Sequence, residues 1–326
     1  MTTLVTGAAG FIGMHVAARL LARGERVVGI DSLDPYYSTA LKEARLDELA
    51  RHPGFAFRRA DLSNMAALRD ALAGERIRWI VHLAAQPGVR YSLENPQAYV
   101  AANVAAHVNV LEYARFADAL DGMVYASSSS VYGGNTKLPF SEGDPVDAPI
   151  SLYAATKKSD ELIAATYAHL FRIPLTGLRF FTVYGPWGRP DMAVWSFTDA
   201  ILEGRPIRVF NHGDMRRDFT YVDDIVSGVV AVSDAPPADD GARPPHRIYN
   251  IGNNRPEPLL RLIELIEEAT GRRAERVLAP MQPGDVHETY ADIDRIRADH
   301  GFEPTTPLAE GIPRFVDWFR GWRARA

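Results

Sequence analysis

The first 180 residues alternate between short apolar runs and longer segments in which apolar residues recur at helical spacing. The short runs are rich in Val, Ile, Leu and aromatic residues, and they predict buried β-strands. The longer segments follow a period of 3.6 and predict helices. We expect strands in TTLVTG (2–7), RVVGID (26–31), FAFRRAD (55–61), WIVHLAA (79–85), MVYASS (123–128) and PLTGLRF (174–180), and helices near 11–23, 39–51, 64–73, 95–118 and 151–171.

This alternation predicts an α/β fold, a doubly wound parallel sheet with helices on both faces. After residue 180 the pattern becomes irregular, with a Gly- and Pro-rich stretch at 184–192 and an exposed loop at 235–245. LLRLIELIEEATG predicts an amphipathic helix that ends at Gly271. We divide the chain into a domain over 1–180, to which segments near 221–250 return, and a smaller α/β lobe over 181–326, with a cleft between them.

Composition excludes several kinds of function. With 326 residues, a net charge of −5 and a pI near 6.0, the chain has no electrostatic attraction for nucleic acid or acidic lipid. The absence of cysteine excludes disulfides and thiolate chemistry, and the nine histidines form no HxxxH or HExxH motif, so we predict no metal. No apolar run reaches the roughly 18 residues of a membrane span, and the N-terminus lacks signal-peptide features. We expect a cytoplasmic protein.

A glycine-rich turn, VTGAAGFIG, follows the first predicted strand. Gly7, Gly10 and Gly13 allow the backbone to approach a pyrophosphate, which the helix N-terminus then binds. The spacing alone also fits a purely structural turn. Asp31 ends the second strand, where a carboxylate binds ribose hydroxyls, and Ser32 after it favours NAD over NADP. Asp61 and Leu62, after the third strand, are candidates for the adenine end.

Two further stretches carry candidate chemistry. Four serines at 127–130 follow a buried strand, where a flexible linker is not expected. Tyr153 and Lys157, in YAATK, are four residues apart and share one helix face. An ammonium beside a phenol favours the phenolate, which is then a general base. The chain has only four Lys among 36 basic residues, so a Lys at this position is informative.

Together these motifs resemble the extended short-chain dehydrogenase/reductase family over essentially the whole chain. The resemblance implies a Rossmann-type fold that binds NAD tightly, with Ser128, Tyr153 and Lys157 as catalytic residues. It also implies a homodimer through the helices near 95–118 and 151–171. Ser127 is expected to be structural, while Ser129 and Ser130 border the substrate. The further cofactor-binding positions that it implies are Phe11, Ile12, Leu83, Ala84 and Ala85, together with Tyr153 and Lys157.

Within this family, the stretches at 31–49, 84–104 and 179–193 resemble UDP-glucuronate 4-epimerases more than UDP-galactose 4-epimerases. That resemblance assigns Thr182 and Arg189 to the sugar carboxylate. Oxidation at C4 of a hexuronate gives a β-keto acid, which readily loses CO2. A hydroxyl and a bidentate guanidinium suit the task of holding that carboxylate away from the geometry of decarboxylation. The alternative for Arg189 is an ordinary surface or phosphate-facing arginine.

The resemblance also implies a site for the UDP end of the substrate. Arg217 corresponds to a diphosphate clamp, and Val209 with Phe210 to a uracil platform. Gln282 stands where galactose-type enzymes carry a second Arg, which weakens the transfer of that phosphate contact. Asp285, Gln86 and Arg90 complete the expected substrate contacts.

The predicted reaction is inversion of C4 through a 4-keto intermediate, with UDP-glucuronate converted to UDP-galacturonate. A UDP-glucose/UDP-galactose 4-epimerase is the first alternative. A UDP-glucuronate decarboxylase is the second, although the serine run lacks the Asp-Glu or Ser-Glu pair that such relatives carry before their VYG. A cofactor-sensing regulatory protein of the same fold is a third, and the retained Tyr153 and Lys157 argue against it.

Overall fold

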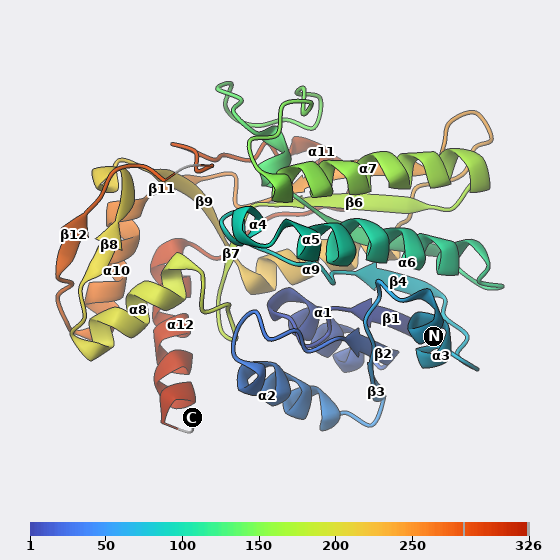
Figure 1. The fold of residues 1–326 in the computed structure, drawn as a ribbon, viewed down its shortest axis with the longest axis horizontal. Helices are drawn as coiled ribbons and strands as arrows, with labels where there is room; N and C mark the ends of the chain where they lie inside the picture. The colour runs from blue at the N-terminus through green and yellow to red at the C-terminus, as the bar shows by residue number, and fades with distance from the viewer. Residues whose placement is uncertain (283, 325–326) are drawn as a thin grey trace.

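A seven-stranded parallel sheet forms the centre of the computed structural model, which describes residues 1–282 and 284–324 (Figure 1). The strand order is β10-β6-β5-β4-β1-β2-β3, and every neighbouring pair is parallel. The predicted doubly wound sheet is confirmed, and the strand at one of its two edges, β10, comes from the segment after residue 180. The strands are β1 (Thr2–Thr6), β2 (Arg26–Asp31), β3 (Phe55–Arg59), β4 (Trp79–His82), β5 (Gly122–Ser128), β6 (Leu175–Phe180) and β10 (His246–Ile251).

Helices cover both faces of this sheet, which explains why its strands are apolar along their whole length. Consecutive residues of a strand point to opposite faces, so Leu4 and Val5 of β1 belong to two different cores. The core with Val5 includes residues of α1 (Phe11–Ala22), α2 (Thr39–Ala50) and α9 (Val222–Asp234). The core with Leu4 includes residues of α3 (Met65–Ala71), α6 (Ala106–Arg115) and α7 (Leu152–Phe171).

The single helix predicted near 95–118 is interrupted. The segment begins with α4 (Tyr91–Glu94) and α5 (Pro96–Tyr99), passes through a π-helical stretch over Val100–Ala105, and continues as α6 to Arg115. The wider π-helical turn carries Asn103, whose side-chain oxygen accepts from the Gln86 amide at 2.7 Å. Its amide group donates to the Gln86 carbonyl and to Thr156 of α7. Helical periodicity alone does not reveal this insertion.

The smaller lobe lies at the carboxyl edge of the sheet (Figure 1). A three-stranded sheet, a two-stranded sheet and three helices enclose its core, which contains Ile201, Phe219, Ile263 and Phe315. Gly271 ends α10 in the left-handed conformation, as predicted. No helix in the described ranges is long and apolar enough to cross a membrane. The elements are β7 (Thr182–Tyr184), α8 (Ala193–Glu203), β8 (Ile207–Val209), β9 (Arg216–Tyr221), β11 (Pro256–Pro258), α10 (Leu259–Thr270), β12 (Arg276–Leu278) and α12 (Leu308–Arg323), while α11 (Asp294–His300) packs beside β10.

Candidate active site

A cavity of about 690 Å³ opens at the carboxyl ends of the central strands. This is the edge at which doubly wound folds bind their ligands. The cavity brings together residues predicted from separate motifs, from the glycine turn to the loop after β7. The predicted residues on its wall are Gly7, Gly10, Phe11, Ile12, Gly13, Asp31, Asp61, Leu62, Leu83, Ala84, Ala85, Gln86, Ser128, Tyr153, Lys157 and Arg189.

The glycine turn is packed too closely for side chains. A Cβ on Gly13 would lie 2.1 Å from the Gly7 carbonyl oxygen, and one on Gly7 would lie 2.8 Å from the Ala84 nitrogen. Gly7 also has a φ of +70°, which side chains disfavour. Gly10 is the N-cap of α1, and no side chain caps the helix there. The first backbone amides of α1 therefore have no side-chain acceptor. The turn fits a pyrophosphate.

Asp31, which was predicted to bind the ribose of a cofactor, lies on the cavity wall. Its carboxylate accepts from the amide of Ala9 at 3.1 Å and from that of Leu33 at 2.8 Å. Burial raises the pKa of Asp31, and these two hydrogen bonds oppose that effect. The carboxylate therefore joins the end of β2 to the glycine turn. Asp61 accepts from the amide and hydroxyl of Ser63 and shapes the neighbouring wall.

Ser128, Tyr153 and Lys157 all lie on the cavity wall. The Lys157 ammonium donates to the Ala126 carbonyl at 2.9 Å and to Asp160 at 3.1 Å, so α7 and β5 both hold it. Burial raises the pKa of Asp160 to about 6, against the opposing charge of Lys157. Asp160 was not predicted as part of the site, although its position at i+3 from Lys157 on a helix is a readable signal.

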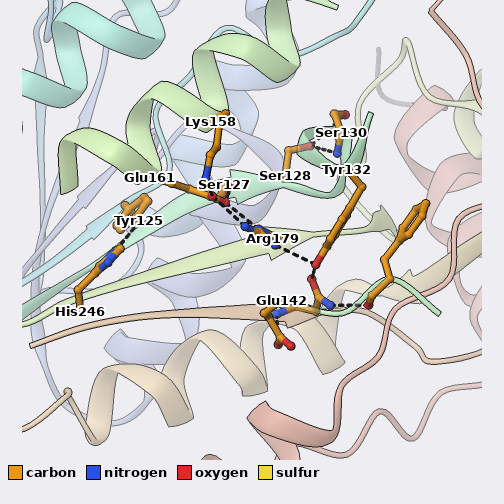
Figure 2. A network of polar contacts seen from close by, with 12 residues as sticks. Tyr125, Ser127, Ser128, Ser130, Tyr132, Glu142, Lys158, Glu161, Arg179 and His246 are labelled. Carbon is orange, nitrogen blue, oxygen red and sulfur yellow. Dashed lines mark hydrogen bonds and ion pairs between the residues drawn. The ribbon is translucent and has the colours of Figure 1, made fainter. Parts of the chain in front are cut away.

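The serine run separates into two environments (Figure 2). Ser127 donates to Glu161 at 2.7 Å, and Glu161 makes a bidentate ion pair with Arg179 at 2.8 and 2.9 Å. Burial opposes ionisation of Glu161, but Arg179 and Ser127 hold its pKa below the usual value. Arg179 continues the network to the Tyr132 hydroxyl at 3.0 Å. Ser127 therefore belongs to a buried polar network, and it also forms part of the cavity wall.

The other serines turn away from that network. Ser128 donates to the Ser130 hydroxyl at 3.1 Å and accepts from the Ser130 amide at 3.1 Å, which caps a short 3₁₀ helix over Ser129–Tyr132. Ser129 and Ser130 lie on that helix, beyond the cavity wall, and their role at the substrate stays a prediction.

Arg189 reaches the cavity from the loop after β7. Its guanidinium already binds Asp191, with Nε at 3.0 Å and Nη2 at 2.7 Å from the carboxylate oxygens. Burial lowers the pKa of Arg189, but Asp191 outweighs that effect and the net shift is upward. Tyr36 also donates to Asp191, at 3.4 Å. Thr182 is half-buried in β7 and lies outside the wall of this cavity.

The residues predicted for the UDP end lie beyond the cavity wall, in two groups. Arg217 donates to Asp285 and to the Val286 carbonyl, both at 2.6 Å. The Arg90 guanidinium lies 5.1 Å from the centre of the Phe210 ring.

Two of these residues have buried side-chain atoms. The Val209 side chain is fully buried in the core of the smaller lobe, and its part in a uracil platform stays a prediction. β8 alternates inward and outward, and Val209 takes an inward position. The Gln282 side-chain oxygen is buried and has no partner among the described residues.

Within the described ranges, no group of three His, Asp or Glu side chains is placed to hold a metal ion. His82 of β4 instead bonds the Thr6 hydroxyl at 2.7 Å, and burial lowers its pKa to about 3.

Comparison with known proteins identifies consistent relatives. Residues 3–252 match the NAD dependent epimerase/dehydratase family. The chain is 49% identical over 331 residues to a probable UDP-glucuronate 4-epimerase of Rhizobium meliloti (strain 1021), covering 98% of this chain and 97% of that protein. It is 47% identical over 329 residues to UDP-glucuronate 4-epimerase 4 of Arabidopsis thaliana, covering 98% of this chain and 75% of that protein.

A solved structure agrees with these matches. The crystal structure of UDP-glucuronic acid 4-epimerase from Bacillus cereus, in complex with UDP-glucuronic acid and NAD, superposes with a TM-score of 0.89 at 34% identity. The match covers 99% of this chain and 100% of the Bacillus cereus chain.

Proposed function

The chain belongs to the NAD dependent epimerase/dehydratase family, and on that premise we propose that it is a UDP-glucuronate 4-epimerase. One observation carries the proposal. A single cavity joins a glycine turn, a hydroxyl–phenol–ammonium set and an arginine. These are the parts that a C4 inversion of a hexuronate requires, and the product is UDP-galacturonate.

The residues around the first half of the cavity fit NAD. The glycine turn leaves no room for side chains where a pyrophosphate approaches, and Asp31 lies where the adenosine ribose hydroxyls would bind. Asp61 and Leu62 would contact the adenine, and Leu83, Ala84 and Ala85 the cofactor's middle section. When bound, NAD accepts a hydride from C4 of the sugar and returns it.

Three side chains handle the proton. Tyr153 takes the proton of the sugar 4-hydroxyl and gives it back, and Ser128 hydrogen-bonds the same oxygen. The Lys157 ammonium stabilises the charge that develops on the Tyr153 oxygen. Its bonds to Ala126 and Asp160 fix its position, so no reorganisation is needed when the proton moves.

The carboxylate of the substrate is assigned to Arg189 and Thr182. The 4-keto sugar is a β-keto acid, and restraint of its carboxylate prevents loss of CO2. Asp191 occupies the Nε–Nη2 edge of the guanidinium and holds the plane of the group in place. Nη1 then remains to donate to the substrate.

The nucleotide end is assigned to Arg217, Phe210, Arg90, Gln282 and Asp285. Arg217 is anchored by Asp285 and would contact the diphosphate. The Gln282 oxygen, which has no partner among residues 1–282 and 284–324, would accept from a ribose hydroxyl of the nucleotide.

We also propose a homodimer through α6 and α7, which lie side by side on one surface (Figure 1). Large apolar side chains on and beside these helices are exposed: Leu93 by 64%, Val100 by 45%, Leu162 by 58% and Leu170 by 60%. Such a concentration of exposed apolar residues is typical of an interface.

A cytoplasmic location is proposed as well, on the absence of cysteine.

Proton NMR of the purified protein with UDP-glucuronate and no added NAD tests the activity. Formation of UDP-galacturonate without a pentose is expected. A UDP-pentose would indicate a decarboxylase. Turnover of UDP-galactose but not of UDP-glucuronate would indicate the neutral-sugar epimerase and would remove the carboxylate role from Arg189.

A further inference from the structure

The loop over residues 185–189, GPWGR, carries Arg189 into the cavity, and we call it the arginine loop. Three consecutive carbonyls of this loop accept from side chains of the cofactor-binding half. His15 of α1 bonds the Pro186 carbonyl at 2.9 Å, and Arg45 of α2 donates to the carbonyls of Trp187 at 2.6 Å and Gly188 at 3.0 Å. A carbonyl only accepts, so Nε2 of His15 carries the proton.

Arg45 is unusual because it is fully buried and, within the part of the chain that the structure describes, none of its hydrogen bonds goes to a carboxylate. Burial accordingly lowers its pKa. Its Nη1 donates to the Ala9 carbonyl, in the glycine turn, at 2.9 Å, and to the Tyr37 hydroxyl at 2.7 Å. Asp31 acts on the Arg45 charge only at a distance, and burying a guanidinium without a directly bonded carboxylate is costly. The position of Arg45 therefore needs a structural reason. That geometry ties the glycine turn directly to the arginine loop.

The loop is also held from the opposite side. Trp187 has a φ of +61°, a left-handed conformation that bulky residues rarely adopt. Its ring packs against Trp318 and Trp322 of the C-terminal helix α12, with ring centres 5.2 and 5.6 Å apart. Strained conformations persist where surrounding contacts determine them, and they concentrate at functional sites. Here the contacts come from α2 and α12, which are about 270 residues apart in sequence.

We propose that Arg45 and Trp318 are positioning residues that hold the arginine loop so that Arg189 meets the substrate carboxylate. Neither side chain contacts the sugar in this proposal, and Trp318 lies outside the cavity wall. The inference rests on the proposed function, because it assumes that Arg189 binds a carboxylate. It adds that recognition of the carboxylate depends on the cofactor-binding half and on the C-terminal helix.

The test compares two ligands that differ only at C6. Binding of UDP-glucuronate and UDP-glucose is measured by calorimetry on NAD-loaded protein, with Tyr153→Phe throughout so that neither ligand is converted. Trp318→Leu should weaken UDP-glucuronate binding roughly tenfold, the order of loss that a small misplacement of a fixed donor causes, and leave UDP-glucose within about twofold. Arg45→Lys, which keeps the charge but loses the fork, should act in the same direction.

Trp195→Leu is the matched control. Trp195 belongs to the same aromatic cluster: its ring centre lies 5.6 Å from that of Trp318 and 4.9 Å from that of Phe319. Among the ring contacts of the described residues, none joins Trp195 to Trp187. The control variant should weaken neither ligand selectively. A double variant supplies the decisive comparison, because Trp318→Leu should have no further selective effect once Arg189→Ala is present.

The outcomes separate the two hypotheses. If Arg189→Ala is selective for UDP-glucuronate but Trp318→Leu and Arg45→Lys weaken both ligands equally or neither, the positioning role is wrong and the proposed function stands. If Arg189→Ala weakens UDP-glucuronate and UDP-glucose equally, Arg189 does not bind the carboxylate, and both the carboxylate assignment and the positioning role are wrong. If Arg45→Lys does not fold, Trp318→Leu alone still tests the positioning role. Trp318 is only half-buried, so we expect this variant to fold.

Discussion

Glu161→Gln should destabilise the protein by about 3–5 kcal/mol, the cost of removing one partner of a buried ion pair. Glu161 accepts four hydrogen bonds: two from Arg179 at 2.8 and 2.9 Å, one from Ser127 at 2.7 Å and a longer one from Lys158 at 3.4 Å. The side chains of Glu161 and Arg179 are each only 3% exposed, so water cannot replace these bonds (Figure 2). Glutamine keeps the shape but turns one acceptor into a donor that faces Arg179 or Ser127.

The assay is urea unfolding at neutral pH with saturating NAD in every sample, so that ligand binding contributes equally. For a slope of about 3 kcal/mol per molar urea, the midpoint should fall by roughly 1 to 1.7 M. Glu303→Gln is the matched control. Glu303 also pairs with an arginine, Arg297, at 2.6 Å, but both side chains are exposed, and the expected loss is below about 1 kcal/mol. Equal shifts in the two variants would refute the argument that burial determines the strength of the Glu161 pair.

Three further predictions follow from single contacts. Gly13→Ala should abolish NAD binding, because the alanine Cβ would lie 2.1 Å from the Gly7 carbonyl oxygen. The amount of bound NAD is measured by chromatography of the nucleotide released from denatured protein. A variant that retains as much NAD as the unmodified protein would contradict the cofactor site. Asp160 has a pKa raised to about 6, above the roughly 3.9 of an unfolded chain, so its folded form binds the proton more tightly. Its contribution to stability is therefore lost as pH rises from about 4 to 6, and the Asp160→Asn variant should lack that component in urea unfolding at pH 4.5 and 7. Leu170→Glu should convert the proposed dimer to monomer in light scattering with unchanged circular dichroism, and an unchanged mass would argue against the α6–α7 interface.

Local sequence predicted much of the fold because its signals act over short distances. Six apolar runs became six neighbouring strands of one sheet, and Gly271 ended its helix as its position after an amphipathic segment predicted. The interruption at Val100–Ala105 escaped prediction, since a π-helical turn leaves the apolar periodicity nearly unchanged.

The site was predicted in part for the same reason. Gly7, Gly13, Tyr153 and Lys157 belong to motifs of fixed spacing, and all four line the cavity. Val209 was assigned from the family resemblance, which does not show that the alternation of β8 turns its side chain into the core. The partner of each charged side chain was also not predictable, because ion pairs depend on which elements meet.

The sequence by itself determined the strand–helix order, the glycine turn and the phenol and ammonium on one helix face, because each depends on residues a few positions apart. Only the tertiary structure decided that Arg45 holds the arginine loop, 142 and 143 residues further along the chain, and that Trp318 packs on Trp187. Neither contact has a local pattern. Each arises when α2 and α12 pack on opposite sides of one loop, and packing is a property of the whole chain.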